Sequence, residues 1–195
     1  MKLKKVLTIV FLIFSFHNIV KADDIRDFEM EGMSIGDSLL LYMSEDKILS
    51  LERYNVNSGY KSDKFFDLRT KKKGPYEEML IGLKLNDKSY KIYSLTGSVK
   101  YKNNISNCYT EIESIEKEFK KLFPNAKISR AKKNKHPADE SGLSIVTSIY
   151  FDFKSGDYAS LQCFDWGNEM SYWDNLRIGI FSDNYSDWLI NEAYE

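Results

Sequence analysis

The chain has 195 residues, with 28 lysines and arginines against 29 aspartates and glutamates, and a formal net charge of −1 at pH 7. This balance gives no electrostatic reason to bind a nucleic-acid backbone or an anionic lipid surface, so we expect no nucleic-acid partner. Two histidines and ten scattered glycines exclude a histidine-rich metal site and the common nucleotide-binding loops, so no metal or cofactor is expected.

The first segment, MKLKKVLTIVFLIFSFHNIVKA (1–22), has the order of a secretory signal peptide: lysines, then an apolar run, then Ala22 before the predicted cleavage site. A permanent anchor would need about 20 apolar residues, and this run is shorter and carries His17 and Asn18. We therefore expect a single exported domain, 23–195, in the periplasm or secreted, with no membrane span after cleavage. Its 24 basic and 29 acidic residues give a formal charge of about −5.

The first half of the mature chain is predicted to hold one short helix and three strands. Ser34 can cap a helix that ends near Met43, and a short strand is expected at 65–69. Apolar residues then alternate along 78–85 and 90–101, which predicts a hairpin with its turn at Asn86 to Lys88.

The strongest predicted helix is SNCYTEIESIEKEFKKLF (106–123), with Ser106 as its cap. Its apolar residues recur every three or four positions: Cys108, Ile112, Ile115, Phe119 and Leu122. Cys108 thus lies on the apolar face of this helix, and Cys163 lies on the apolar face of a predicted strand. An even number of cysteines in an exported chain favours a Cys108–Cys163 disulfide over two buried thiols, and a helix packed on the sheet would bring the sulfurs together.

The second half resembles the first in its order of elements. A polar segment at 129–142 is predicted to be a loop, and the remaining strands and last helix are expected at 144–153, 158–164, 172–181 and 183–194. The two hairpins, 83–95 and 151–163, share a pattern at an offset of 68 residues. An ancient duplication into half-repeats 33–101 and 104–195 and a chance likeness both stay open.

This order predicts the α+β class: antiparallel sheet, in one or more sheets, with helices packed on one face, and with two helix-plus-three-strand pseudo-repeats if the duplication is real. The plan resembles the β-lactamase-inhibitor-protein and outer-membrane BamE-like folds. That resemblance concerns element order only and implies adaptor or inhibitor modules.

The sequence offers little for nucleophilic catalysis. His136 is the only histidine of the mature chain, and Asp139 and Ser141 follow it in HPADESG. A Ser–His–Asp site needs rigid placement and an oxyanion hole, and this segment has no apolar periodicity. We therefore predict a surface loop, and no catalytic residue is assigned.

Carboxylates near residue 170 give a second hypothesis. Asp165, Glu169 and Asp174 are the candidates for a two-acid hydrolase. The same acids with Asn168 or Asn175 could hold calcium, although the spacing lacks the alternating oxygen ligands of an EF-hand. Spacing alone selects no catalytic pair.

The segment DWGNEMSYWD (165–174) is the candidate ligand-binding site, with Trp166, Glu169, Tyr172 and Trp173 as its residues. Large aromatic side chains dominate interface hot spots and also stack on sugars. The alternative is that they fold over the core, because aromatic rings bury large areas.

Three segments, GMSIGDSLL, HPADESG and SGDYASLQCFDWGNEMSYWDNLR, resemble motifs of a family of uncharacterised exported bacterial proteins. The resemblance spans nearly all of the mature chain and implies no activity for any residue. The leading hypothesis is a non-catalytic, soluble binding or envelope-adaptor domain with an unknown protein or glycan partner. The alternatives are a carboxylate-dependent envelope hydrolase and a glycan-binding protein.

Overall fold

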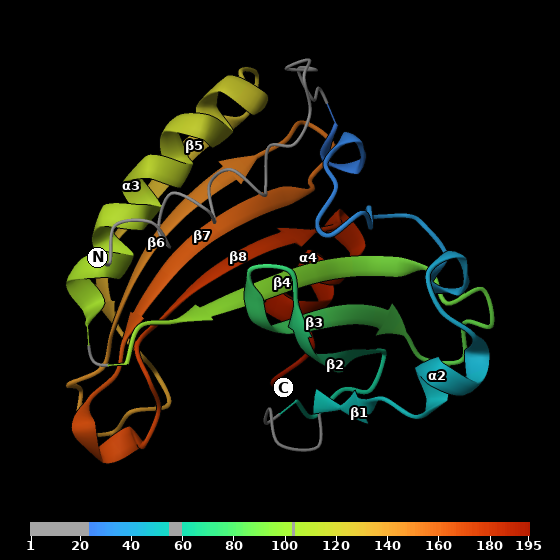
Figure 1. The fold of residues 1–195 in the computed structure, drawn as a ribbon, viewed down its shortest axis with the longest axis horizontal. Helices are drawn as coiled ribbons and strands as arrows, with labels where there is room; N and C mark the ends of the chain where they lie inside the picture. Colours follow the sequence, from blue (N-terminus) through green and yellow to red (C-terminus); the bar gives the residue numbers. More distant parts are fainter. Residues whose placement is uncertain (1–23, 55–59, 103) are drawn as a thin grey trace.

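A computed structural model describes residues 24–54, 60–102 and 104–195, so the predicted signal peptide at 1–22 lies outside the described residues. The described part is built on one antiparallel sheet of eight strands in the order β1-β2-β3-β4-β8-β7-β6-β5 (Figure 1). The strands are β1 (Glu52–Arg53), β2 (Phe65–Lys73), β3 (Tyr76–Lys84), β4 (Ile92–Lys100), β5 (Lys127–Lys135), β6 (Ile145–Asp152), β7 (Tyr158–Asp165) and β8 (Asn175–Phe181). The predicted α+β class is confirmed.

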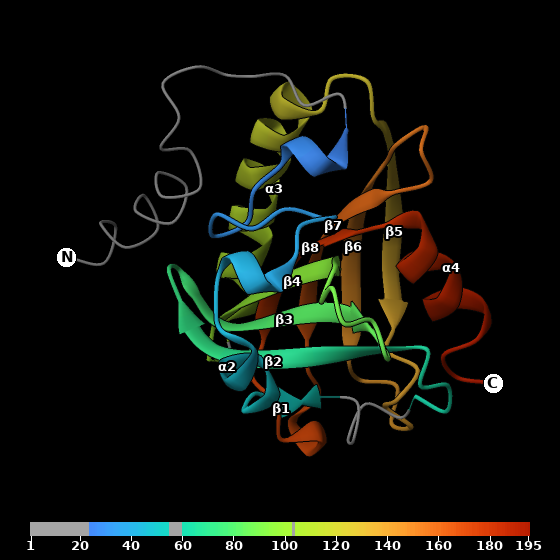
Figure 2. The same cartoon turned by 90° about the vertical axis from the view of Figure 1, so that its right-hand side faces the viewer.

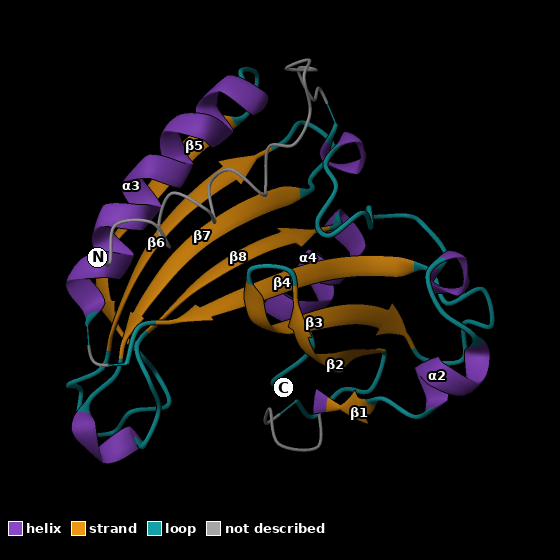
Figure 3. Cartoon of the chain, in the orientation of Figure 1, coloured by secondary structure: helices purple, strands orange, loops and turns teal. Residues whose placement is uncertain are grey.

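Helices stand on both sides of this sheet (Figures 2 and 3). They are η1 (Ile25–Asp27), η2 (Leu39–Leu41), α2 (Glu45–Leu49), α3 (Ile105–Leu122), η4 (Asn168–Met170) and α4 (Asp183–Asn191). Helix α3 and the N-terminal segment lie on one side and α4 lies on the other, as Figure 2 shows. No helix in the described ranges is long and apolar enough to cross a membrane.

The first face of the sheet is apolar because period-two alternation puts every second side chain there. It carries Met79 and Ile81 of β3 and Leu176 and Ile178 of β8, all of them fully or almost fully buried. The apolar stripe of α3 and the N-terminal segment from Ile25 onward cover this face and form one continuous core with it. This face therefore supplies most of the buried apolar surface.

A disulfide joins the helix to the sheet. Cys108 of α3 and Cys163 of β7 are both fully buried and bonded, with Cα atoms 6.0 Å apart. The predicted disulfide is confirmed. As expected, it joins the apolar face of α3 to the apolar face of the sheet.

The two halves of the chain meet in the middle of the sheet. Strands β2, β3 and β4 form one antiparallel meander, β5 to β8 form the other, and β4 pairs with β8 along its length. In each half a helical segment that precedes the strands packs on the apolar face. The half-repeats stay a prediction, because a duplication and a chance likeness are both compatible with this arrangement.

The last helix packs on the opposite face. Trp188 of α4 is fully buried against Phe65 of β2, with ring centroids 5.4 Å apart. Its Nε1 donates to Ser62 Oγ at 2.9 Å. Because α4 covers only one end of this face, the rest of the face is left uncovered by any helix of the described residues.

The predicted loop at 129–142 is wrong for its first part. Residues Lys127–Lys135 form β5, which pairs with β6 and lies at the edge of the sheet. Edge strands are commonly protected from aggregation by lysines, and they need no apolar alternation. The hydrophobic pattern therefore gave no strand signal here.

Two predicted helix starts are also wrong. Gly36 has a φ of +96°, which no right-handed helix contains, so the helical turns begin later, capped by Ser38 and Ser44 instead of Ser34. Helix α3 begins at Ile105 after Asn104, one residue before the predicted cap Ser106.

Candidate functional site

The uncovered face of the sheet is polar, and Arg177 of β8 lies at its centre. Strand register pairs Arg177 with Ser98 of β4 on one side and with Gln162 of β7 on the other. Side chains of directly paired residues project from the same face of a sheet. Arg177 is therefore flanked by one hydroxyl and one amide side chain.

The rows above and below Arg177 are also mostly polar. Gly179 lies between Thr96 and Ser160 in one row, and Asn175 lies between Lys100 and Phe164 in the other. Central strands of a sheet usually carry large apolar residues on both faces only when both faces are covered. The hydroxyl and amide groups here indicate a face that contacts solvent or a polar partner.

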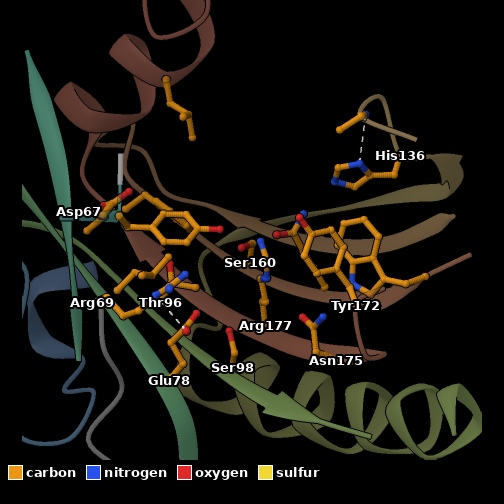
Figure 4. Close-up of a pocket in the computed structure, with 18 of the residues that line it drawn as sticks. Asp67, Arg69, Glu78, Thr96, Ser98, His136, Ser160, Tyr172, Asn175 and Arg177 are labelled. Atoms are coloured by element: carbon orange, nitrogen blue, oxygen red, sulfur yellow. Dashed lines mark hydrogen bonds and ion pairs between the residues drawn. The ribbon is translucent and has the colours of Figure 1, made fainter. Parts of the chain in front are cut away.

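These rows form the floor of a cavity of about 780 Å³, which we call the polar cleft. Many of the residues that line it are aromatic: Tyr54, Tyr60, Tyr150, Tyr158, Trp166, Tyr172, Trp173, Phe181, Tyr185 and Tyr194. Figure 4 shows Arg177 in the middle of the cleft, with Asp67, Arg69 and Glu78 toward one end and Tyr172 and His136 toward the other.

The guanidinium of Arg177 has no ion pair and no hydrogen bond to any other described residue, although the cleft contains acidic and polar groups. Its carbon Cζ lies 4.2 Å from the centre of the Phe164 ring, so one face of the guanidinium stacks on an aromatic side chain. Burial lowers the pKa of Arg177 below its usual value. The centre of the cleft thus holds a partly desolvated positive charge without a counterion.

The acid on the floor nearest in register to Arg177 is already used by another arginine. Glu78 of β3 pairs with Ser98, and its Oε2 lies 3.1 Å from Nε of Arg69. Arg69 also lies 3.6 Å from Oε1 of Glu52, and its guanidinium stacks over Tyr54 at 4.4 Å. This second arginine is neutralised and held in place, in contrast to Arg177.

His136 lies at the far end of the cleft. The backbone N–H of Ala138 donates to its Nδ1 at 3.2 Å, so the neutral ring carries its proton on Nε2. Burial, and then the charge of Arg177, lower the pKa of His136. The imidazole is therefore neutral at pH 7 and adds no positive charge there.

The Ser–His–Asp arrangement, for which the sequence offers little support, is not formed by His136, Asp139 and Ser141. Asp139 accepts hydrogen bonds from Ser141 Oγ at 2.6 Å and from the backbone N–H of Ser144 at 2.7 Å. Because the Ser141 hydroxyl donates to Asp139 and His136 Nδ1 accepts from Ala138, no chain of hydrogen bonds runs from Ser141 through His136. These bonds close the loop after β5, as the surface-loop hypothesis expects.

Asp67 lies at the end of the cleft near α4. It is 3% exposed, and Tyr185 Oη donates to its Oδ1 at 2.8 Å. Burial raises the pKa of Asp67 to about 6, although hydrogen bonds from Tyr185 and Tyr60 act in the opposite direction. This carboxyl therefore changes charge close to neutral pH.

The aromatic segment 165–174 forms the rim of the cleft near His136. Trp166, Tyr172 and Trp173 all line the cleft, whereas Glu169 is exposed on η4 and is not among the residues that line it. The structure thus brings together three of the four sequence-predicted residues. Tyr172 and Trp173 are 60% and 49% exposed, so their rings are accessible at the rim.

Trp166 is held in place by its neighbours. Its ring stacks on Phe164 at 5.6 Å with an interplanar angle of 17°, and the His136 and Tyr172 rings lie 4.6 and 4.9 Å away. Its backbone N–H donates to Asp174 Oδ1 at 3.0 Å. This tryptophan is thus packed into the wall, whereas a ligand-binding role for Tyr172 and Trp173 stays a prediction.

The acids of the hydrolase hypothesis do not meet in the cleft. Asp174 is buried and caps the backbone of Trp166, and Asp165 shares a face with Cys163, on the α3 side of the sheet. Burial raises the pKa of Asp165, the charge of Asp174 adds to this effect, and Lys133 opposes it. Neither acid, nor Glu169, is among the residues that line the cleft.

Arg177 is the residue that sequence reasoning missed. It stands in NLRIGI, and the alternation of Leu176, Ile178 and Ile180 assigns it to the uncovered face. A single arginine in a strand that is otherwise apolar is a weak signal, but it can be recognised. What the sequence did not show is that β8 lies in the middle of the sheet.

Comparison of the chain with protein-family models, with curated proteins and with solved structures finds no match. The resemblance to exported bacterial proteins and to BamE-like or β-lactamase-inhibitor-like modules stays a prediction.

Proposed function

We propose that this chain is an exported, non-catalytic binding domain that holds a protein segment in the polar cleft. One observation carries the proposal: within the described part of the chain, Arg177 has no counterion, and it lies at the centre of a sheet face that no helix covers. A buried or partly buried charge without a partner is costly, and proteins keep such groups mainly at functional sites. A partner that pairs with Arg177 would remove this cost.

The composition of the cleft supports recognition of a protein segment. Tyrosine, tryptophan and arginine are the residues most enriched in interface hot spots, and serine and asparagine add adaptable hydrogen bonds in antibody binding sites. All of these types line the cleft, and the rim residues Tyr172 and Trp173 are accessible. The floor is rigid because it belongs to the central strands of the sheet, which lowers the entropy lost on binding.

A glycan partner is less well supported by the same geometry. Sugars stack on a free aromatic face, but the ring of Trp166 is packed against Phe164, His136 and Tyr172. The ring of Trp173 faces the ammonium groups of Lys100 and Lys102, at 5.1 and 5.5 Å. Trp166 therefore offers no unoccupied platform, and Trp173 already contacts two lysine side chains.

Export is the second part of this proposal. The predicted signal peptide at 1–22 supports it, and the buried Cys108–Cys163 disulfide fits an oxidising compartment such as the periplasm or the extracellular space. An envelope-adaptor role is the form of binding that this location favours.

The test is selection of peptides from a displayed heptapeptide library against the exported chain. Binding of the selected peptides should weaken roughly tenfold or more in Tyr172→Ala and Trp173→Ala, because both side chains are accessible rim anchors. Leu41→Ala removes a side chain that is 73% exposed and does not line the cleft, and it should leave binding unchanged.

Two results would contradict the proposal. A library that yields no peptide sensitive to the rim variants would show that the cleft is not a peptide-binding surface. Cleavage of a bound peptide by the unmodified chain, detected by mass spectrometry, would show an enzyme instead of a binding domain.

A further inference from the structure

The charge of Arg177 can be used to identify the chemical group that the cleft binds. Its guanidinium stacks on Phe164 through one face, at 4.2 Å, so the donors left for a ligand are the N–H groups around its edge. Those donors form a planar fork that fits the two oxygens of a carboxylate, with two parallel hydrogen bonds. The orientation therefore favours a planar anion over a neutral group.

The neighbours of Arg177 complete a site for one anionic group. Ser98 is its direct cross-strand partner, and Thr96 and Ser160 occupy the next row of the floor, so three hydroxyl side chains lie in the same row as Arg177 or in the next one. Lys100 adds a second positive charge in the adjacent row, where it also contacts Trp173. Hydroxyls can donate to carboxylate oxygens that the arginine leaves unpaired.

The acids in the cleft do not occupy this position. Glu78 is held by Arg69, and Asp67 lies under Tyr185 at the end of the cleft near α4. Glu78 still favours the charged form of Arg177 through its own negative charge, but an anion that pairs directly with the guanidinium would come from outside the described part of this chain.

The charge of the whole chain limits what that anion is. The mature chain is acidic, with a formal charge of about −5, so a polyanion such as a nucleic acid or a multiply phosphorylated partner would be repelled. A carboxylate carries one charge and can take both hydrogen bonds of the Arg177 fork, whereas a phosphate dianion carries nearly two charges and the floor adds only Lys100 in the row beside Arg177. One carboxylate on an otherwise polar or aromatic segment satisfies both conditions.

We propose that Arg177 binds the carboxylate of an aspartate, a glutamate or a C-terminus on a protein segment inserted into the polar cleft. This inference rests on the proposed function and names the chemical group by which the partner is anchored. The aromatic walls contact the neighbouring residues of the segment, and the carboxylate fixes its position on the floor.

The experiment is a double-mutant cycle with the peptides selected above. Replacing the anchoring glutamate or aspartate of the peptide by its amide, or Arg177 by glutamine, should each weaken binding roughly 30-fold or more, as for other desolvated charge pairs. Combining the two changes should cost little more than either alone. Arg177→Lys should recover only part of the affinity, because an ammonium lacks the planar fork.

Arg130→Gln is the matched control. It removes a guanidinium from β5 that is bonded to Glu116 and does not line the cleft, so peptide affinity should not change. Thermal unfolding of Arg177→Gln should remain cooperative, which separates loss of binding from loss of folding.

The possible results are distinguishable. Peptides that depend on Tyr172 but not on their own carboxylate or on Arg177 would overturn the carboxylate assignment and leave the proposed function intact. Absence of any peptide that depends on the cleft would overturn both. Glucuronate-containing oligosaccharides or inorganic phosphate that bind more tightly than the selected peptides, in an Arg177-dependent manner, would overturn the assignment to a protein segment.

Discussion

The two faces of the central sheet are built from the same strands but differ in burial and polarity. On the α3 side, Cys108, Phe119 and Ile178 are almost or fully buried among apolar neighbours, and the disulfide closes the layer. On the cleft side, Arg177 has no counterion among the described residues, and burial raises the pKa of Asp67. One face therefore supplies stability, and the other carries free-energy costs that a purely structural role would not need.

The largest effect should come from the stable face. Replacing Cys108 and Cys163 together by alanine removes a link across 55 residues, which in the loop-entropy model lowers the free energy of unfolding by about 4 kcal/mol. The measurement is urea unfolding under oxidising conditions. Thr110→Ala, on the exposed side of the same helix, is the control and should change stability by less than about 0.5 kcal/mol. A loss below about 1 kcal/mol in the double variant would show that packing alone holds α3 on the sheet.

The stable face was also the part of the fold that sequence reasoning predicted best. Its strands alternate cleanly, α3 has an apolar stripe, and the two cysteines lie on the two faces that meet. Each of these signals follows from burial, which acts on the hydrophobic pattern directly. Strand β5 was missed because a charged edge strand is not buried and so leaves no such pattern.

The cleft was only partly predictable for the same reason. Trp166, Tyr172 and Trp173 were found because aromatic side chains are conspicuous in a polar segment, and all three line the cleft. Arg177 was missed because its importance depends on the pairing of β8 with β4, a contact between residues about 80 positions apart in the sequence. Periodicity reports which face a residue occupies, but it does not report which strands are neighbours.

A second prediction concerns the cost of the cleft face at neutral pH. The pKa of Asp67 is raised from 3.8 to about 6 in the folded chain, so its contribution to stability is fully present below about pH 4 and is lost as the pH rises through 6. The loss amounts to about 3 kcal/mol at most, at 1.36 kcal/mol for each pH unit. Asp67→Asn cannot ionise and can still accept the hydrogen bond from Tyr185.

The Asp67→Asn variant should therefore be more stable than the unmodified chain at pH 8, by up to about 3 kcal/mol, and should match it or be slightly less stable at pH 4. Urea unfolding at the two pH values measures the difference. Destabilisation of the variant at pH 8 but not at pH 4 would mean that Asp67 is needed as an anion in the folded chain, and would place it among the groups that act in the cleft instead of those that only limit stability.

The smallest change in stability is expected for Arg177→Met, and its best comparison is a substitution at the adjacent residue of β8, Ile178, on the opposite face. Arg177→Met keeps the aliphatic stem of the side chain but removes the guanidinium, which stacks on Phe164 and has no counterion among the described residues. The lost cation–π contact costs about 0.5–1 kcal/mol, and relief of the desolvated charge offsets it or exceeds it. Ile178→Ala, on the opposite face and 1% exposed, should instead lower the free energy of unfolding by about 2–5 kcal/mol. If Arg177→Met lowered the free energy of unfolding as much as Ile178→Ala does, Arg177 would be a structural residue. A nearly unchanged free energy of unfolding together with loss of peptide binding is the result expected if Arg177 serves to bind a partner.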